Sequence, residues 1–224
     1  MGVPKALEPT GIVLVDKPAG PSSFAIVADV RRRTGAKTGH AGTLDPFATG
    51  LLVLLSGRAT SLQDRFMKLD KRYRTEIDLT RTTTTGDPEG EAGEAHEPLD
   101  GTALEAALAR LRGEVELPIP TASAVKIDGE RAYKLHRKGI EVEMPTRVMR
   151  VHELVVRSQA PGRVDLDLHV GSGTYVRALA EALGGHCLTL RRTTIGPYSV
   201  EASDPERVVP LTEALPLLAG WVVP

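Results

Sequence analysis

Cysteine is almost absent from this chain of 224 residues, which contains only Cys187. A single thiol forms no disulfide within the chain and builds no zinc site from cysteines, so we expect a reducing compartment. Long apolar runs are missing too, because the longest, residues 51–55, is far shorter than the ~20 residues of a membrane-spanning helix. The first residues, MGVPKALEPTG, lack the apolar core of a signal peptide. The sequence therefore predicts a soluble, cytoplasmic protein.

An excess of either charge is also missing. The chain has 28 Lys and Arg against 29 Asp and Glu, a formal charge of −1, which excludes a protein that holds nucleic acid by bulk positive charge alone. The charges are nevertheless separated along the chain. Residues 17–74 hold 11 basic and 4 acidic side chains (+7), residues 86–116 hold 2 and 9 (−7), and residues 121–160 hold 8 and 5 (+3). Any one such run is usually solvated surface, but we expect the basic segments to face a polyanion and the acidic segment to face away from it.

The distribution of apolar and capping residues predicts a mixture of strands and helices. Strands are expected at residues 11–15, 51–55, 71–79, 151–156, 164–170 and 188–195, and helices at 23–33, 104–111, 130–138, 175–183 and 211–218. Residues 82–98 are expected to form an exposed loop. Because these elements do not alternate as regular βαβ units, we predict an α+β fold with a mixed, largely antiparallel sheet flanked by helices and loops. No linker divides the chain, so we expect a single domain spanning residues 1–224.

The segment GHAGTLDPFATG at residues 39–50 is the most informative part of the sequence. Its glycines, threonines and proline define a turn between a helix and an apolar strand, and functional residues are often carried by loops anchored in this way. The carboxylate of Asp45 could act as a nucleophile, a general base or a metal ligand, or it could only close a turn ahead of Pro46. No His and acidic cluster surrounds it, so we expect no metal.

This segment resembles the catalytic motif of the TruB family of tRNA pseudouridine synthases, and further stretches resemble that family in the same order. They are GIVLVDKPAGPSS from residue 11, KRYRTEIDLTRTTTTGD from residue 71, ASAVKIDGERAYKLHRKGIEV from residue 122, GSGTYVRALAEALG from residue 171 and LTLRRTTIGPYSV from residue 188. The resemblance runs from about residue 11 to residue 218. It implies the catalytic fold of the pseudouridine synthases.

The resemblance implies that the chain isomerises uridine 55 in the T loop of tRNA to pseudouridine. The N1–C1′ bond breaks, the uracil rotates and a C5–C1′ bond forms, with no redox change, so no cofactor is expected. A base in folded RNA must be flipped out before its ribose carbon can be reached. The alternative function is a non-catalytic tRNA-binding or tRNA-folding protein of the same fold. A glycosidase would need a second positioned carboxylate, which the motif does not offer.

By the same resemblance, three residues carry the chemistry. Asp45 is the catalytic carboxylate, and attack on C1′, attack on the uracil ring and assistance to glycal formation all stay open. Arg177 pairs with Asp45, since a guanidinium keeps a buried carboxylate charged and oriented. Tyr73 stacks on the target base and is a candidate for moving the C5 proton. From the residues alone, Tyr73 could equally be a strand aromatic that faces the core, and Arg177 a solvent-facing helix residue.

Four more residues are implied to bind the substrate. His40 stacks in the place of the flipped nucleotide, Tyr175 borders the uracil pocket and Leu190 lines it. Lys17 supports the pocket or binds a phosphate. Their structural alternatives are a solvated loop for His40, core packing for Tyr175 and Leu190, and a Lys-Pro turn for Lys17.

The sequence departs from the family pattern in two places. Leu117 and Ala122 stand where the family usually has a glutamine and an aromatic residue, ahead of an RNA-gripping insertion at about residues 121–147. The chain also stops at Pro224, so we expect no C-terminal PUA-type domain and a weaker affinity for tRNA. We expect the T stem-loop of tRNA as the partner, no guide RNA or obligatory protein partner, and a monomer.

Overall fold

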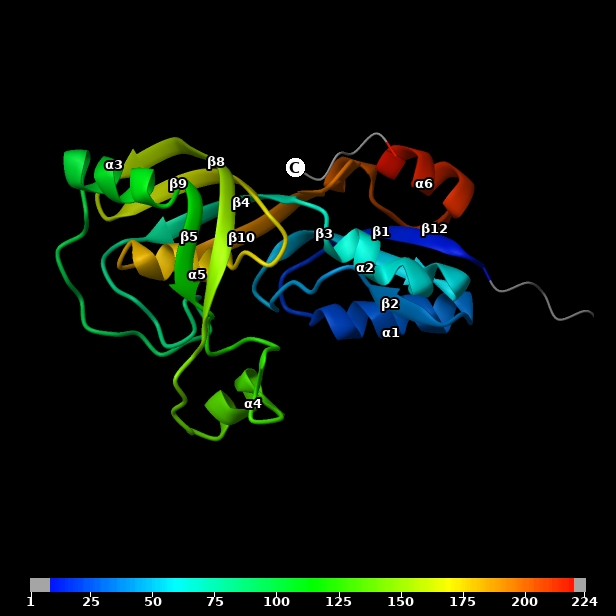
Figure 1. Ribbon diagram of the computed structural model, residues 1–224, viewed down its shortest axis with the longest axis horizontal. Coiled ribbons are helices and arrows are strands. Elements are labelled where there is room, and N and C mark those ends of the chain that lie inside the picture. Colours follow the sequence, from blue (N-terminus) through cyan, green and yellow to red (C-terminus); the bar gives the residue numbers. More distant parts are fainter. Residues whose placement is uncertain (1–8, 220–224) are drawn as a thin grey trace, which may run out of the picture. The chain divides into compact units, whose positions relative to one another are not determined.

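The computed structural model describes residues 9–219 and divides the chain into two compact units (Figure 1). Unit 1 combines the chain before Tyr73 with the chain from Arg191 onward, and unit 2 is Tyr73–Leu190. Two strands, β4 (Lys71–Asp78) and β10 (His186–Ile195), contribute residues to both units. No helix within residues 9–219 is long and apolar enough to cross a membrane. The expectation that residues 1–224 form a single domain stays a prediction.

Unit 1 is built on a mixed sheet in the strand order β12-β1-β3-β10, with β2 also paired to β3. The strands are β1 (Gly11–Lys17), β2 (Thr38–His40), β3 (Thr49–Ser56) and β12 (Asp204–Pro210). β1 pairs antiparallel with β3 and β12, whereas β3 and β10 run parallel where Gly50 faces Arg192. The short β11 (Tyr198–Ser199) pairs with β10.

Side chains alternate between the two faces of β1 and β3, and each face of this sheet has its own helices. On one face Val13, Val15, Leu52 and Leu54 pack with Val30 of α1 (Ser23–Thr34). The opposite face carries Ile12, Leu14, Leu51, Val53 and Leu55, packed with Phe66 of α2 (Gln63–Met67) and with Ala214 and Leu218 of α6 (Leu211–Ala219). A 3-10 helix, Gly57–Leu62, links β3 to α2, and a second, Val200–Ala202, precedes β12.

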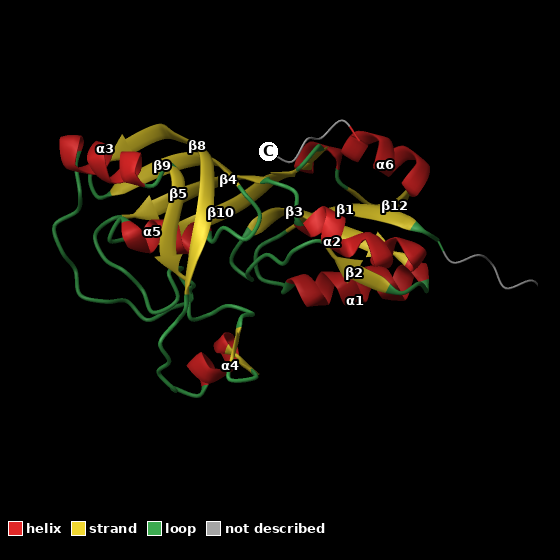
Figure 2. Cartoon of the chain, in the orientation of Figure 1, coloured by secondary structure: helices red, strands yellow, loops and turns green. Residues whose placement is uncertain are grey.

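Unit 2 has the strand order β10-β4-β9-β8-β5. Its further strands are β5 (Gly113–Pro118), β8 (Thr146–Ala160) and β9 (Arg163–Val170), and its longer helices are α3 (Gly101–Arg110) and α5 (Val176–Ala182). β8 pairs antiparallel with both β9 and β5. Figure 2 also shows a small excursion between β5 and β8, which holds β6 (Lys126–Ile127), β7 (Glu130–Arg131) and α4 (Ala132–Arg137) within the expected insertion.

The predicted α+β class with a mixed, largely antiparallel sheet is confirmed. Helix α1 begins and ends as expected, because the Ser22 hydroxyl accepts a hydrogen bond from the Ala25 N–H and Gly35 closes the helix at φ 65°. The expectation of a wholly exposed loop at residues 82–98 is wrong in one part, since Thr85, Gly86 and Asp87 are buried. Strands β5 and β12 were not expected, because both are charged and mostly exposed.

Candidate active site

Asp45 lies in unit 1, half-buried in the turn that joins β2 to β3. The Asp45 carbonyl accepts a hydrogen bond of 3.2 Å from the Ala48 N–H, which closes the turn around Pro46. The backbone of this turn is held from several sides by buried polar side chains. The carboxylate therefore belongs to a segment whose conformation is set by the surrounding structure, as an aimed catalytic group requires.

Ser23 and Lys17 hold the turn from the side of β1 and α1. The Ser23 hydroxyl donates to the Leu44 carbonyl (2.7 Å) and accepts from the Leu44 N–H (2.8 Å). The Lys17 ammonium donates to the carbonyls of Pro18, Pro21 and Pro46, at 2.8, 2.9 and 3.2 Å. Of the two roles expected for Lys17, its complete burial favours support of the pocket over phosphate binding.

Arg192 holds the same turn from strand β10, although only 1% of the residue is exposed. Its guanidinium donates to the carbonyls of Gly42 (3.1 Å) and Thr43 (3.2 Å), and its Nε donates to the Leu51 carbonyl (2.7 Å). The planar fork of arginine suits several fixed carbonyl acceptors at once. The carbonyls on both sides of Asp45 thus have buried cationic donors.

Gly50 permits the close approach of β3 and β10 beside this turn. Its φ is 100°, and a Cβ at this position would lie 2.2 Å from the Arg192 carbonyl oxygen. A side chain at residue 50 would therefore separate the strand that carries Arg192 from the turn that Arg192 holds.

His40 ends β2 and lies two residues before Gly42, whose N–H donates to His40 Nδ1 at 3.2 Å. Burial lowers the pKa of His40, and the positive charge of Arg192 lowers this pKa further. Both effects favour a neutral imidazole, and a neutral ring is what allows Nδ1 to accept the hydrogen bond. The ring also contacts Phe24 edge to face, with centroids 5.4 Å apart. A neutral flat ring can replace a stacked base, which is the role that the resemblance to the TruB family implies for His40.

Arg177 lies in unit 2, in the first turn of α5, and is 3% exposed. Its Nη1 donates to the Thr85 carbonyl (2.6 Å) and lies 3.4 Å from Asp87 Oδ2, while Nη2 donates to the Ala122 carbonyl (3.0 Å). The alternative of a solvent-facing helix residue is therefore wrong. The expected pairing of Arg177 with Asp45 would join the two units and stays a prediction.

Asp87 completes the surroundings of Arg177. Its Oδ1 accepts from the Thr85 hydroxyl (2.6 Å) and from the Glu89 N–H (3.0 Å). Glu181, one turn along α5 from Arg177, has a pKa raised by burial and, to a lesser extent, by Asp87, although Arg177 acts in the opposite direction. The guanidinium thus interacts electrostatically with two acidic residues, and the more deeply buried of them, Asp87, forms the ion pair.

Three further expected site residues also belong to unit 2. Tyr73 is half-buried on β4, on the face that it shares with buried Thr75 and Ile77. Tyr175 is half-buried just before α5, and the Arg147 guanidinium lies 5.7 Å from its ring centroid. Leu190 is 7% exposed on β10. Since Asp45, His40 and Lys17 belong to unit 1, a common pocket for the whole set stays a prediction.

Sequence reasoning missed Arg192 and Asp87. A signal existed for Arg192, because it follows Leu190 with a spacing of two along a strand whose alternate residues face inward. A charged residue at such a position is a candidate for a buried hydrogen-bonding role. Asp87 had no comparable signal, since an acid after four threonines and a glycine is typical of an exposed turn.

The histidines of unit 2 that could share a metal ion are His152 and His169, whose ring centroids lie 4.8 Å apart. The expectation that the site around Asp45 binds no metal stays a prediction.

Comparisons with known proteins relate the chain to one family. Residues 31–176 match the TruB family of pseudouridylate synthases, N-terminal domain. The chain is 45% identical over 208 residues to the tRNA pseudouridine synthase B of Thermobifida fusca (strain YX), covering 85% of this chain and 71% of that relative. It is 43% identical over 208 residues to the tRNA pseudouridine synthase B of Mycolicibacterium paratuberculosis, covering 87% and 71%.

Solved structures agree with this relationship. A crystal structure of a Cbf5-Nop10-Gar1 complex aligns with a TM-score of 0.64 and 26% identity over 84% of this chain, which spans 50% of the length of that solved chain. A crystal structure of a pseudouridylate synthase aligns with a TM-score of 0.51 and 16% identity, over 95% of this chain and 75% of that one, and supports the fold alone. With a family match over more than half of its residues and relatives covered over more than two thirds of their length, the chain belongs to the TruB family of pseudouridine synthases, which are isomerases.

Proposed function

We propose that this protein converts uridine 55 in the T loop of tRNA to pseudouridine, with Asp45 as the catalytic carboxylate. The relatives named tRNA pseudouridine synthase B support tRNA as the substrate. The observation that carries the proposal is the turn around Asp45, because Ser23, Lys17 and Arg192 hold the backbone on both sides of this carboxylate.

The reaction conserves every atom of the nucleoside. The N1–C1′ bond breaks, the uracil turns within the site, and C5 forms the new bond to C1′ while its proton leaves and N1 gains one. The carboxylate of Asp45 acts on the nucleoside in this proposal, by attack on C1′ or the uracil ring or by assisting the loss of a ribose proton. Tyr73 stacks on the base, and its hydroxyl is suited to relaying the C5 proton.

The substrate base reaches this carboxylate only after it has been flipped out of the T loop. His40 fills the vacated space with its neutral ring, and the hydrogen bond from the Gly42 N–H to Nδ1 fixes the orientation of that ring. Arg177, held by Asp87 and the Thr85 carbonyl, supplies the fixed positive charge that keeps the reacting carboxylate ionised.

The test is the substitution Asp45→Asn, which keeps the shape of the side chain and removes its charge. Pseudouridine formation on an unmodified tRNA transcript should be lost, while the Kd for that transcript stays within about threefold of the wild-type value. Asp64→Asn is the matched control, because Asp64 is exposed on α2 in the same unit, and it should retain activity.

Position-resolved mapping of the product separates the remaining alternatives. Substantial activity in Asp45→Asn would overturn the role of this carboxylate, and conversion at another uridine would overturn the assignment to the T loop. Tight binding with no conversion by the wild-type protein would instead identify a non-catalytic tRNA-binding protein.

A further inference from the structure

The outer face of α1 carries the aromatic side chain of Phe24, which belongs to neither hydrophobic cluster of unit 1. Phe24 is 58% exposed, and it is the one aromatic residue among the exposed large hydrophobic side chains of residues 9–219. The chain has only three phenylalanines, and Phe66 is fully buried in the core of unit 1. An exposed phenyl ring in a chain this poor in aromatic residues indicates a contact surface.

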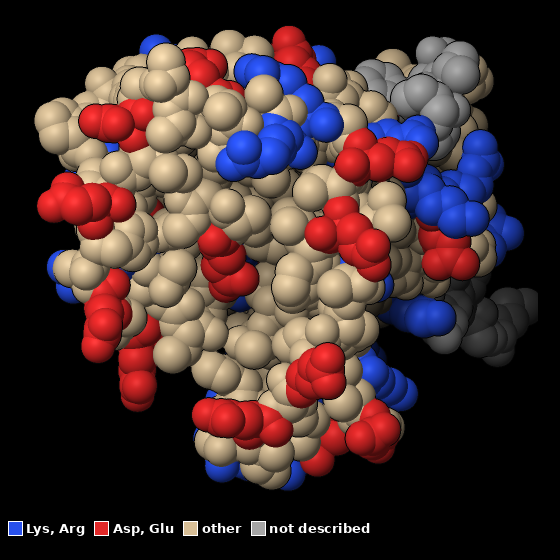
Figure 3. Space-filling view, turned by 60° about the vertical axis from the view of Figure 1, so that its left-hand side comes forward, with Lys and Arg blue, Asp and Glu red and all other residues tan. Residues whose placement is uncertain are grey.

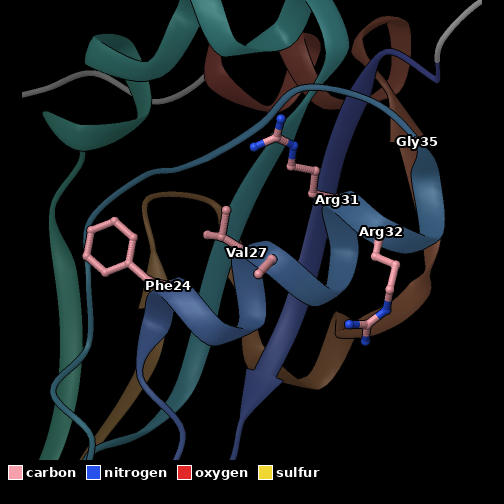
Figure 4. A pocket seen from close by; sticks show the side chains of 6 residues that line it. Phe24, Val27, Arg31, Arg32 and Gly35 are labelled. Atoms are coloured by element: carbon pink, nitrogen blue, oxygen red, sulfur yellow. The ribbon is translucent and has the colours of Figure 1, made fainter.

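Basic side chains continue from Phe24 along the same helix. Phe24, Ala28, Arg31 and Arg32 are spaced by three and four residues, which places them on one helical face. Together with Val27 and Gly35 they line a shallow hollow of about 580 Å³. Figure 4 shows Phe24 at the start of α1 and the two arginines projecting from its last turns.

The three arginines at the end of α1 differ in their ion pairs. Arg33 is paired with both Asp29 and Glu206, and Arg32 is paired with Asp29 while 76% of its side chain is exposed. The side chain of Arg31 has no hydrogen-bond or ion-pair partner within residues 9–219. Its positive charge is therefore available to an anion from outside the chain.

Phe24 also reaches the residue that is proposed to replace the flipped base. Its ring meets the His40 ring at an interplanar angle of 88° with centroids 5.4 Å apart, so the two side chains are in edge-to-face contact between α1 and β2. Bases stack on exposed aromatic rings whatever their identity, and arginines beside such rings bind the adjoining phosphates. Figure 3 shows basic and acidic side chains interspersed over the face that it presents, so that face carries no uniform positive charge.

We propose that the outer face of α1, formed by Phe24, Ala28, Arg31 and Arg32, is a second RNA-binding surface, on which an unpaired nucleotide stacks on Phe24 and its phosphate binds Arg31. This inference rests on the proposed function, since the RNA is the tRNA in which His40 takes the place of the flipped base. It adds an anchoring contact outside the reacting uridine.

The experiment measures binding of the full chain to an unmodified tRNA transcript by fluorescence anisotropy over a series of salt concentrations. Phe24→Ala should weaken binding about tenfold at constant salt, the size of one lost base-stacking contact, whereas Phe24→Trp should retain wild-type affinity. Arg31→Ala should lower the slope of log K against log salt by about 0.7–0.9, the loss of one phosphate contact. Arg110→Ala is the control, because Arg110 is an exposed helix residue in the acidic segment expected to face away from RNA, and its slope should match the wild type.

Wild-type affinity and slope in both Phe24→Ala and Arg31→Ala would overturn this surface. An altered sedimentation of the free Phe24→Ala protein with unchanged RNA binding would assign the face to a protein contact and would also overturn it. Equal thermal midpoints of the variants confirm that they are folded. Because binding is measured without turnover, a wild-type protein that binds tRNA but forms no pseudouridine would overturn the proposed function and leave the test of this surface intact.

Discussion

The guanidinium of Arg177 lies 3.4 Å from the carboxylate of Asp87, and each side chain is only 4% exposed. Removing one partner of a buried ion pair leaves the other charge without compensation. The pair lies in the same unit as the exposed pair between Arg163 and Glu76, at 3.2 Å with 56% and 37% exposure. The two pairs provide a matched comparison of buried and exposed ion pairs.

We expect Asp87→Ala to lower the free energy of unfolding by roughly 3–5 kcal/mol, because Arg177 would remain buried and charged. Glu76→Ala should lower it by less than about 1 kcal/mol, since the exposed pair is screened by water. Urea denaturation of both variants measures the difference. Equal losses of unfolding free energy in the two variants would show that the buried charge of Arg177 is not stabilised by Asp87.

The contacts of Arg192 predict that it immobilises the turn around Asp45. In Arg192→Met the carbonyls of Gly42, Thr43 and Leu51 lose their guanidinium donor, at roughly 1–3 kcal/mol for each buried acceptor left unsatisfied. Amide hydrogen exchange should accelerate across residues 42–48. The neighbouring Arg191→Met is the control, because Arg191 is 39% exposed and pairs with Asp16 at 2.7 Å. Unchanged exchange in Arg192→Met would contradict the assigned role.

The hydroxyl of Tyr73 is predicted to act in catalysis, so Tyr73→Phe should lower turnover on tRNA by at least tenfold with little change in Kd. Tyr198→Phe removes the same atom from a core tyrosine, whose hydroxyl donates to the Ala214 carbonyl at 3.0 Å. This control should lose about 1 kcal/mol of stability and keep its turnover. Single-turnover kinetics distinguishes the two variants, and unchanged turnover in Tyr73→Phe would leave only the ring as the functional part.

The buried Lys71 is predicted to make the protein more stable as the pH rises above neutrality. Burial and the charge of Arg192 lower the pKa of Lys71 from 10.5 to about 8, although Asp70 acts to raise it. Between these two pKa values the unfolded chain binds more protons than the folded protein, so stability rises with pH. The free energy of unfolding of the wild type, relative to Lys71→Met, should increase by about 1–2 kcal/mol from pH 7.5 to 9.5. A constant difference would show that the pKa of Lys71 is ordinary.

Local patterns predicted the regular elements whose signals lie within a few residues. The Ser22 cap and Gly35 end defined α1, and the alternation through Tyr73, Thr75 and Ile77 defined the two faces of β4, because capping and side-chain alternation are short-range properties. Strand β12 was not predicted from local patterns. Its sequence, DPERVVP, is charged, and it becomes a strand by pairing with β1, more than 180 residues earlier in the chain.

The sequence by itself determined the family, the α+β class and the identity of Asp45 as the residue to test, since these depend on motifs that can be read along the chain. Only the tertiary structure decided the partners of the buried charges. Lys17, Arg177 and Arg192 are each almost fully buried, and the sequence indicated the carbonyl partners of none of them. A cation can stay buried only where several acceptors converge on it. Most of those acceptors are backbone carbonyls, and those of Pro46, Thr85, Ala122, Gly42, Thr43 and Leu51 come from distant segments. Every residue type has such a carbonyl, so only the fold determines which of them meet.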